Sequence, residues 1–330
     1  MDLRTASAGS YPRIGDDPDQ QALRAACARF ARGELGAAGL RAAEDDAAAR
    51  AIAEQIEAGL DVVTDGLVRW YDPISHVAQA LMGIRPGPLR RFFDTGMEFR
   101  QPIVRGPIVR TRALVTEDYA FAAARSDRPV KAVLTGPLTL AAVSVIETPA
   151  YPGLETLTET YAEVLAGELA ALGAAGARLV QLDEPAALAG PAALALLGRV
   201  LPVIVAAKGD VELMLALPFG DPLPLWPQIA RLPVDVVALD LTGSPHLEAL
   251  PPAEGPIPRL ALGLVDARTT AEDDVAGRAA LAARVLAAAP PGPHYLTTSC
   301  GLEMVPRAAA RRKLALLGAI RAALNGGALS

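Results

Sequence analysis

Short apolar segments rich in β-branched residues alternate along the chain with longer segments of helical period. This alternation restricts the fold most, because repeated βα units place successive strands in parallel and cover the sheet with the intervening helices. Eight segments are expected as strands, at residues 5–10, 61–65, 131–135, 178–182, 202–206, 235–241, 259–265 and 294–299. Eight parallel strands close into a barrel, so the sequence predicts an α/β fold, a (β/α)8 TIM barrel, formed as one domain over residues 1–330.

Helices are expected between these strands, at residues 44–58, 154–173, 191–200, 271–289 and 307–325. The fourth helix is predicted to start at Thr269 and Thr270, because hydroxyl acceptors followed by acidic residues favour a helix N-terminus. Residues 89–115 do not fit the repeat and read as two strands separated by Gly and Pro. We expect an inserted hairpin or excursion there.

The composition excludes several classes of protein. Hydrophobic residues make up 52% and aromatic residues 4% of the 330 residues, which suits a barrel core of Ala, Leu, Val and Ile. The net charge is −6 and the basic residues are dispersed, so nucleic acid is not an expected partner. Two cysteines cannot form a disulfide framework, and the apolar runs are too short to span a membrane. Without a signal sequence, the chain is expected to be cytoplasmic.

Polar residues follow nearly every predicted strand, at the face where parallel barrels carry their chemistry. A single Gly, Asp or Ser at such a point is more often turn chemistry than catalysis. Here polar residues follow all eight predicted strands at the same point, which favours a functional site. The endings include Gly9-Ser10-Tyr11-Pro12-Arg13, Thr135-Gly136-Pro137-Leu138-Thr139, Gln181-Leu182-Asp183-Glu184-Pro185, Leu239-Asp240-Leu241-Thr242, Asp266-Ala267-Arg268 and Ser299-Cys300-Gly301-Leu302-Glu303.

In this order and spacing, the blocks resemble the catalytic domain of cobalamin-independent methionine synthase, from about Ala8 to Leu324. That family transfers a methyl group from a methylated folate to the sulfur of homocysteine. The resemblance implies that Asp183, with Glu184 beside it, binds the amino group of an amino-acid thiol, and that Gly9 and Ser10 contact its carboxylate end. Gly-Pro-Leu-Thr is shared with uroporphyrinogen decarboxylases and indicates only the superfamily.

The resemblance also implies a zinc ion, which in the family is held by a His-x-Cys pair after the fifth strand, a Glu after the sixth and a Cys after the eighth. Alignment on Gly209 puts Val205 and Ala207 at the His-x-Cys positions, and neither can bind a metal. Asp240 and Cys300 remain as candidate metal ligands, and His246 is a possible substitute. Zinc is therefore expected to bind weakly or not at all.

Two further positions depart from the family. A family Glu that helps hold substrate and folate falls on Leu67, and the proton-delivering His falls on Arg268. A guanidinium cannot donate a proton usefully at neutral pH, although it can hold an anion. Asp183 and Arg268 are the candidate catalytic residues.

Three functions remain open. The first is a methyltransferase acting on an amino-acid thiol, with a methylated folate or a methylcobamide as donor and with an unknown accessory protein as a possible partner. The second is a metal-free enzyme like uroporphyrinogen decarboxylase, with Arg13, Arg69 and Arg268 as anchors for a polyanion. The third is a non-catalytic barrel that binds an amino acid or pterin, or that supports a partner enzyme.

Overall fold

Seven parallel strands form the centre of the protein in a computed structural model that describes residues 2–244 and 246–326. Their order in the sheet is β1-β10-β9-β8-β7-β6-β4. The strands are β1 (Leu3–Thr5), β4 (Lys131–Thr135), β6 (Leu179–Asp183), β7 (Glu212–Leu217), β8 (Val236–Asp240), β9 (Arg259–Val265) and β10 (His294–Thr298).

Two isolated parallel bridges close this sheet into a ring. Ala6 pairs with Val62, and Val63 pairs with Val130. The Val62 amide donates to the Thr5 carbonyl at 3.0 Å, and the Lys131 amide donates to the Val63 carbonyl at 2.8 Å. Residues 62–63 thus occupy the place of the second strand, and the predicted (β/α)8 barrel is confirmed.

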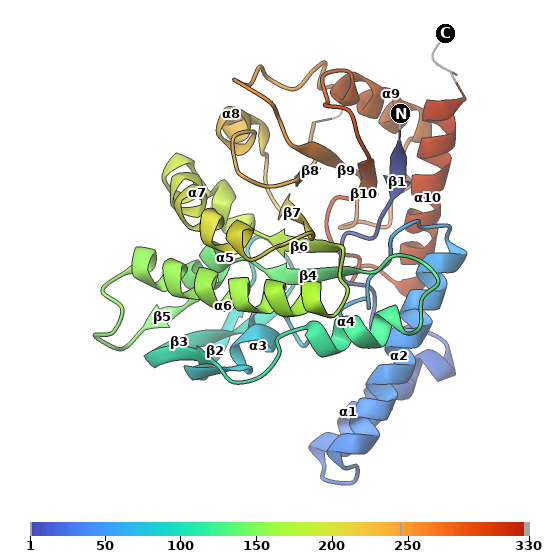
Figure 1. Cartoon of the computed structure of the whole chain (residues 1–330). Helices are drawn as coiled ribbons and strands as arrows, with labels where there is room; N and C mark the ends of the chain where they lie inside the picture. Colours follow the sequence, from blue (N-terminus) through green and yellow to red (C-terminus); the bar gives the residue numbers. More distant parts are fainter. Residues whose placement is uncertain (1, 245, 327–330) are drawn as a thin grey trace.

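Helices cover the outside of the ring (Figure 1). In this view α5, α6 and α7 lie on one side of the strands, and α9 and α10 lie on the other. The helices are α1 (Ala22–Ala31), α2 (Ala37–Glu57), α3 (Pro73–Ala78), α4 (Thr116–Ala123), α5 (Pro137–Val143), α6 (Leu154–Ala174), α7 (Pro191–Ala206), α8 (Trp226–Ile229), α9 (Val275–Leu286) and α10 (Arg307–Asn325), with short 3-10 turns η1 (Pro18–Gln21), η2 (Pro185–Ala189) and η3 (Leu223–Leu225). None of these helices, within the described ranges, is long and apolar enough to cross a membrane.

The expected excursion is a β-hairpin outside the barrel. Strand β2 (Leu81–Arg91) pairs antiparallel with β3 (Glu98–Arg110), and β3 pairs with β5 (Val145–Ile146) in parallel. The hairpin begins at Leu81, earlier than the predicted residue 89. Gly83 permits a register shift near its start, because a Cβ at this position would lie 2.3 Å from the Pro107 carbonyl oxygen. Figure 1 shows the hairpin beside α3 and α6.

The fifth strand of the barrel was predicted at the wrong place. Residues 202–206 continue α7, because Leu197, Leu201 and Ile204 are buried at helical spacing while Pro202 is exposed. The strand is β7, which follows the left-handed turn at Gly209. Nearly all of its residues are buried, so its sequence lacks the alternation that marks a strand with one exposed face.

Other helices and strands also begin or end at residues that differ from the predicted ones. Helix α9 starts at Val275, not at residue 271, because the Asp274 carboxylate caps it by accepting from the Ala276 amide at 3.1 Å. Asp273 pairs instead with Lys313 at 3.0 Å. The first strand lies at Leu3–Thr5, so the prediction at residues 5–10 was placed too late in the chain, and the second strand is present only as its two bridges.

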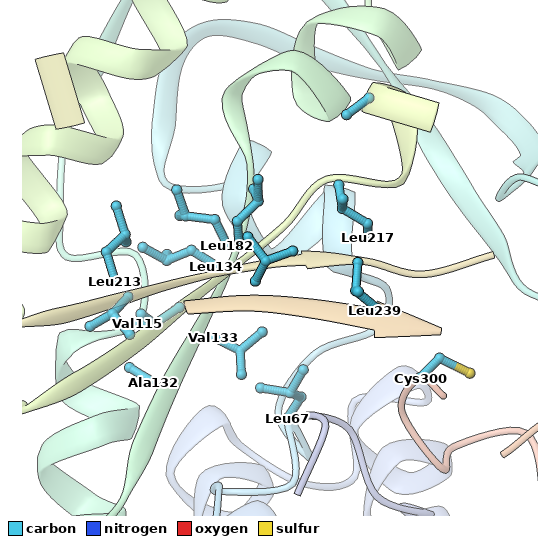
Figure 2. Close-up of a cluster of buried hydrophobic side chains, with 14 of the residues drawn as sticks. Leu67, Val115, Ala132, Val133, Leu134, Leu182, Leu213, Leu217, Leu239 and Cys300 are labelled. Carbon is cyan, nitrogen blue, oxygen red and sulfur yellow. The ribbon is translucent and has the colours of Figure 1, made fainter. Parts of the chain in front are cut away.

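Buried hydrophobic side chains form two clusters around the strands. The larger cluster fills the space between strands and helices, and Figure 2 shows Leu134, Leu182, Leu213, Leu217 and Leu239 within it. A smaller cluster collects Ala6, Val62, Leu179, Met214, Val236, Ala261 and Tyr295 from every strand position except β4. Strand β4 carries the buried Lys131 instead, so a charged group lies in the barrel beneath its carboxyl-terminal face.

Candidate functional site

A cavity of about 180 Å³ opens at the carboxyl ends of the barrel strands. Its walls come from the loops that follow the strands, as expected for a barrel enzyme. The sequence-predicted residues Gly9, Ser10, Asp183, Asp240 and Cys300 all line it. The barrel thus brings these residues to one face, although they are far apart in the sequence.

Asp183 is joined to a buried lysine through a glutamine. The Gln181 amide nitrogen donates to Asp183 Oδ1 at 2.6 Å and to the Ala8 carbonyl at 2.6 Å, and its oxygen accepts from Lys131 Nζ. Burial raises the pKa of Asp183 and lowers that of Lys131, and the attraction between the two charges opposes both shifts. The network fixes the direction of the Asp183 carboxylate at the cavity wall.

Ser10 meets a carboxylate that we had not predicted. The Ser10 hydroxyl donates to Glu303, and the Leu302 amide donates to the Ser10 carbonyl at 2.9 Å. Gly301 makes this approach possible, because a Cβ there would lie 1.8 Å from Ser10 Oγ. Burial raises the pKa of Glu303 to about 7, and nearby Asp183 adds to the effect. Two acidic residues therefore share this end of the cavity.

A buried salt bridge holds the loop that carries Gly9 and Ser10. The Tyr11 hydroxyl donates to Glu54 at 2.8 Å, and the Arg307 guanidinium lies 3.0 Å from the same carboxylate. Arg307 also donates to the Pro12 carbonyl at 2.9 Å. The first loop is thus tied to both α2 and α10.

The Glu184 carboxylate forms hydrogen bonds with the start of α5. It accepts from the Leu138 and Thr139 amides, both at 2.9 Å, and from the Thr139 hydroxyl at 2.6 Å. These bonds satisfy free amides at the N-terminus of α5. Burial raises the pKa of Glu184 to about 7 despite them. Glu184 is fully buried and is not among the residues lining the cavity, so its predicted contact with substrate has no geometric support here.

Asp240 is held by two neighbours. Its Oδ1 accepts from the Thr242 hydroxyl at 2.6 Å and from the Thr242 amide at 3.0 Å, while Arg268 Nη2 lies 3.5 Å from Oδ2. Burial raises the pKa of Asp240, and Thr242 and Arg268 oppose that shift. Arg268 is 40% exposed and does not line the cavity, so it acts on the cavity through Asp240.

Cys300 lies past the strand ends. In Figure 2 its sulfur is directed away from the labelled leucines of the core. Burial raises the pKa of its thiol, and the negative charge of Glu303 raises it further. The thiol form is therefore favoured at neutral pH.

The positions that would complete a zinc site supply no donor atoms. Because the fifth strand is β7, the residues at its end that line the cavity are Ala216, Leu217 and Pro218, and the earlier placement on Val205 and Ala207 is wrong. His246 is exposed and lies outside the cavity lining. Within the described ranges, no three His, Cys, Asp or Glu side chains are grouped as a metal site. Cys300 and an Asp240 already paired with Arg268 do not fit zinc, which takes at least three protein ligands.

Aromatic and aliphatic side chains form the remaining wall. Trp70, Tyr71, Phe92 and Phe219 line the cavity, and Leu67 stands where the resemblance implied a glutamate. The rings of Phe92 and Phe219 meet edge to face with centroids 6.1 Å apart. Leu67 and Phe219 have φ angles of 50° and 68°, a conformation that costs energy in residues other than glycine. This apolar wall suits a planar or aliphatic group.

The three arginines proposed to bind a polyanion are not brought together. Arg13 lines the cavity and lies over the Tyr71 ring at 5.3 Å. Arg69 is buried, pairs with Asp45 at 2.6 Å and stacks on Phe121. Arg268 pairs with Asp240 as described above. The decarboxylase-like alternative therefore gains no support from the cavity.

Sequence reasoning missed Lys131, Gln181 and Glu303 as site residues. The first two lie within β4 and β6, where an inward position at period two could have identified them once the strand directions were known. Glu303 is three residues beyond Cys300 in a block already considered functional. Its role depends on the fold of the loop, which the sequence pattern does not specify.

Comparisons with known proteins agree with this architecture. The family model for the cobalamin-independent synthase catalytic domain matches residues 3–323. A methionine synthase from Saccharolobus solfataricus is 28% identical over 94% of this chain and 92% of its own length. A solved B12-independent methionine synthase from Shewanella sp. W3-18-1, in complex with selenomethionine, superposes with a TM-score of 0.78 over 99% of this chain and 98% of its own, at 20% identity.

Longer relatives match as well. A 5-methyltetrahydropteroyltriglutamate–homocysteine methyltransferase from Cronobacter sakazakii is 28% identical over 94% of this chain but only 42% of its own length. A Synechococcus protein of the same name is 34% identical over 56% of this chain and 24% of its own length. The chain thus spans less than half of these curated relatives.

Proposed function

Because the chain belongs to the family of cobalamin-independent synthase catalytic domains, a family of methionine-synthase-like methyltransferases, we propose that it methylates the sulfur of a small amino-acid thiol. The observation that carries the proposal is the convergence of Ser10, Asp183 and Cys300 on one cavity at the carboxyl ends of the strands. The cavity is smaller than the roughly 300–1,000 Å³ of sites for drug-sized ligands. An amino acid of the size of homocysteine suits it better than a whole folate does.

Asp183 is proposed to bind the ammonium group of this amino acid. Gln181 directs its carboxylate by donating to Oδ1, so Oδ2 takes no hydrogen bond from Gln181 at the cavity wall. A charge-assisted hydrogen bond to a buried carboxylate is stronger than a neutral one, so it would fix the orientation of the ligand. Gly9 and Ser10 stand beside it as the proposed contacts for the other end of the amino-acid backbone. Glu184 is proposed to position α5 and not to touch the ligand.

The reaction breaks the bond from the methyl carbon to the carrier and forms a carbon–sulfur bond, while the thiol loses its proton. A folate nitrogen would keep the bonding electron pair and gain a proton, whereas the cobalt of a cobamide would keep the pair and the proton would pass to solvent. Arg268 does not supply that proton. Burial acts to lower its pKa, but Asp240 and Asp266 outweigh this effect and raise it. We propose that Arg268 positions Asp240 in the wall and keeps its charge balanced.

The methyl carrier is proposed to lie at the aromatic wall. Trp70, Phe92 and Phe219 offer ring faces and edges to a planar heterocycle, and Arg13 with Tyr71 stands at the same cavity. The proposed donor is a methylated folate or a methylcobamide, of which only the methyl-bearing part would reach this cavity. The donor set favours weak zinc binding or none, which distinguishes this chain from the zinc-dependent pattern implied by the resemblance.

A methyl-transfer assay tests the proposal. The protein is incubated with homocysteine and either methylated folate or methylcobalamin, with and without added zinc, and methionine is measured. Product from one donor, lost in Asp183→Asn, supports the proposal. If calorimetry also shows no binding of homocysteine or methionine, the amino-acid thiol is the wrong substrate class.

A further inference from the structure

We propose that Glu303 supplies a second carboxylate for the ligand's ammonium group and so determines specificity for an amine-bearing ligand. The inference rests on the proposed function, because it concerns the same cavity. It goes further by assigning the role to a residue at a position that the resemblance did not indicate.

The acidic side chains around the cavity differ in their charged partners. Asp183 is balanced by Lys131 through Gln181, and Asp240 is balanced by Arg268 at 3.5 Å. Asp183 and Asp240 lie at the carboxyl ends of β6 and β8, whereas Lys131 is the first residue of β4. Asp240 therefore already has a cation beside it, whereas Asp183 forms no direct ion pair within the described ranges and can still accept an ammonium.

Asp72 is the third acidic residue of the cavity wall, and its carboxylate already accepts hydrogen bonds from backbone amides. It caps α3 by accepting from the Ile74 amide at 2.9 Å and from the Ser75 amide at 2.6 Å. Its charge therefore faces the positive end of a short helix and is satisfied by the backbone.

Glu303 differs from all three. Its side chain lines the cavity and accepts a hydrogen bond from the Ser10 hydroxyl. Among the described residues, Glu303 takes part in no ion pair. A half-buried carboxylate that lines the cavity without a cation favours a positive group in this part of the cavity.

Backbone contacts hold Glu303 in this position. The Leu302 amide donates to the Ser10 carbonyl at 2.9 Å, and Gly301 leaves room for the two side chains to meet. On another part of the cavity wall, Leu67 has replaced the family glutamate with an apolar side chain. The carboxylate lost at Leu67 is thus replaced by one from the last loop, and an ammonium would be bound between Asp183 and Glu303.

Isothermal titration calorimetry with three probes tests this assignment. The probes are L-methionine, its decarboxylated amine and its deaminated acid. Wild type should bind both probes that carry an amine. Glu303→Gln keeps an oxygen that can accept from Ser10 but removes the charge, and it should weaken both of these probes by about tenfold or more. Glu303→Asp should retain part of the affinity, and Glu272→Gln, in an exposed loop, is the matched control.

The number of protons released on ligand binding is a second measurement, and a purely structural role of Glu303 would not affect it. An ammonium stabilises the ionised form of Glu303, whose pKa is about 7 in the free protein. Binding of L-methionine at pH 7 should therefore release protons, measured in two buffers of different ionisation enthalpy. Binding of L-methionine to Glu303→Gln should release fewer protons than binding to wild type.

The outcomes separate the two proposals. If wild type and Glu303→Gln bind methionine with equal affinity and equal proton release, the role of Glu303 is refuted and the proposed function stands. If wild type binds neither amine-bearing probe, the proposed function fails and this inference fails with it. Preferred binding of the deaminated acid would also overturn the assignment.

Discussion

At the scale of single residues, the candidate site is a set of carboxylates whose partners differ. Asp183 is linked to Lys131 through Gln181, Asp240 pairs with Arg268, Glu184 accepts from the N-terminus of α5, and Glu303 accepts from the Ser10 hydroxyl. The residue types alone do not reveal these differences. They arise from the loops that the barrel brings together, which is why the sequence identified Asp183 and Asp240 but assigned Glu184 to the ligand and missed Glu303.

Asp183→Asn should weaken binding of homocysteine or methionine more than Asp240→Asn does. The lost charge-assisted hydrogen bond to an ammonium typically costs about 1.5 to 3 kcal/mol, whereas Asp240 is paired with Arg268 and Thr242. Calorimetric titration of both variants measures the difference. Equal affinities for Asp183→Asn and wild type would remove Asp183 from the binding site.

At the scale of elements, strands and helices with a regular hydrophobic pattern were predictable, whereas segments without such a pattern were not. Strands β4 and β9 and helix α10 match their predicted ranges. The error at β7 arose because Pro202 and the β-branched residues near it resemble a strand, while tertiary packing extends α7 through them. The second strand was predicted as a full segment, although only two bridges form there.

Gly136→Ala should destabilise the protein through Glu184. A Cβ at Gly136 would lie 2.3 Å from the Glu184 carboxyl carbon and would displace it from the N-terminus of α5. We expect a loss of about 1 to 3 kcal/mol in the free energy of unfolding, measured with urea. Gly318→Ala in α10 is the control, because a Cβ there meets nothing within 4 Å, and it should be neutral or stabilising. Similar effects of the two changes would refute this role for Gly136.

The corrected position of β7 gives a prediction for metal binding. Ala216→His with Pro218→Cys adds an imidazole and a thiolate to the cavity wall near Asp240 and Cys300, and it should increase zinc binding. Val205→His with Ala207→Cys is the matched control, since these residues lie at the end of α7 outside the cavity lining, and it should not increase zinc binding. Dialysis against zinc followed by elemental analysis compares them. Greater zinc binding by the control pair would favour the earlier alignment.

At the scale of the whole molecule, the barrel and the family were both predictable, because eight βα units and several specific blocks appear in order. The links that unite the two ends of the chain were not. Arg307 at the start of α10 reaches Glu54 in α2 and the Pro12 carbonyl in the first loop. Such contacts depend on the closure of the barrel, which places the first and last segments together, and no local pattern in the sequence encodes them.

Glu54→Gln should destabilise the protein much more than Glu57→Gln. Arg307 is 3% exposed and would remain charged and buried, at a cost of about 3 kcal/mol or more. Glu57 pairs with Arg311 on the surface at 3.2 Å, where both side chains are at least half exposed, and its loss should cost less than about 1 kcal/mol. Urea unfolding of both variants gives the comparison. Equal losses would mean that the buried pair does not secure the first loop.

We propose that this barrel keeps the amino-acid end of a methionine-synthase-like site, and that Ala216, Pro218 and an Asp240 paired with Arg268 stand where the resemblance implies metal ligands. The most direct test is the zinc content of the purified wild-type protein, measured by elemental analysis after dialysis against a mild chelator. We predict far less than one zinc ion per chain. Tight, stoichiometric zinc would contradict the account and would return the chain to the zinc-dependent pattern of its family.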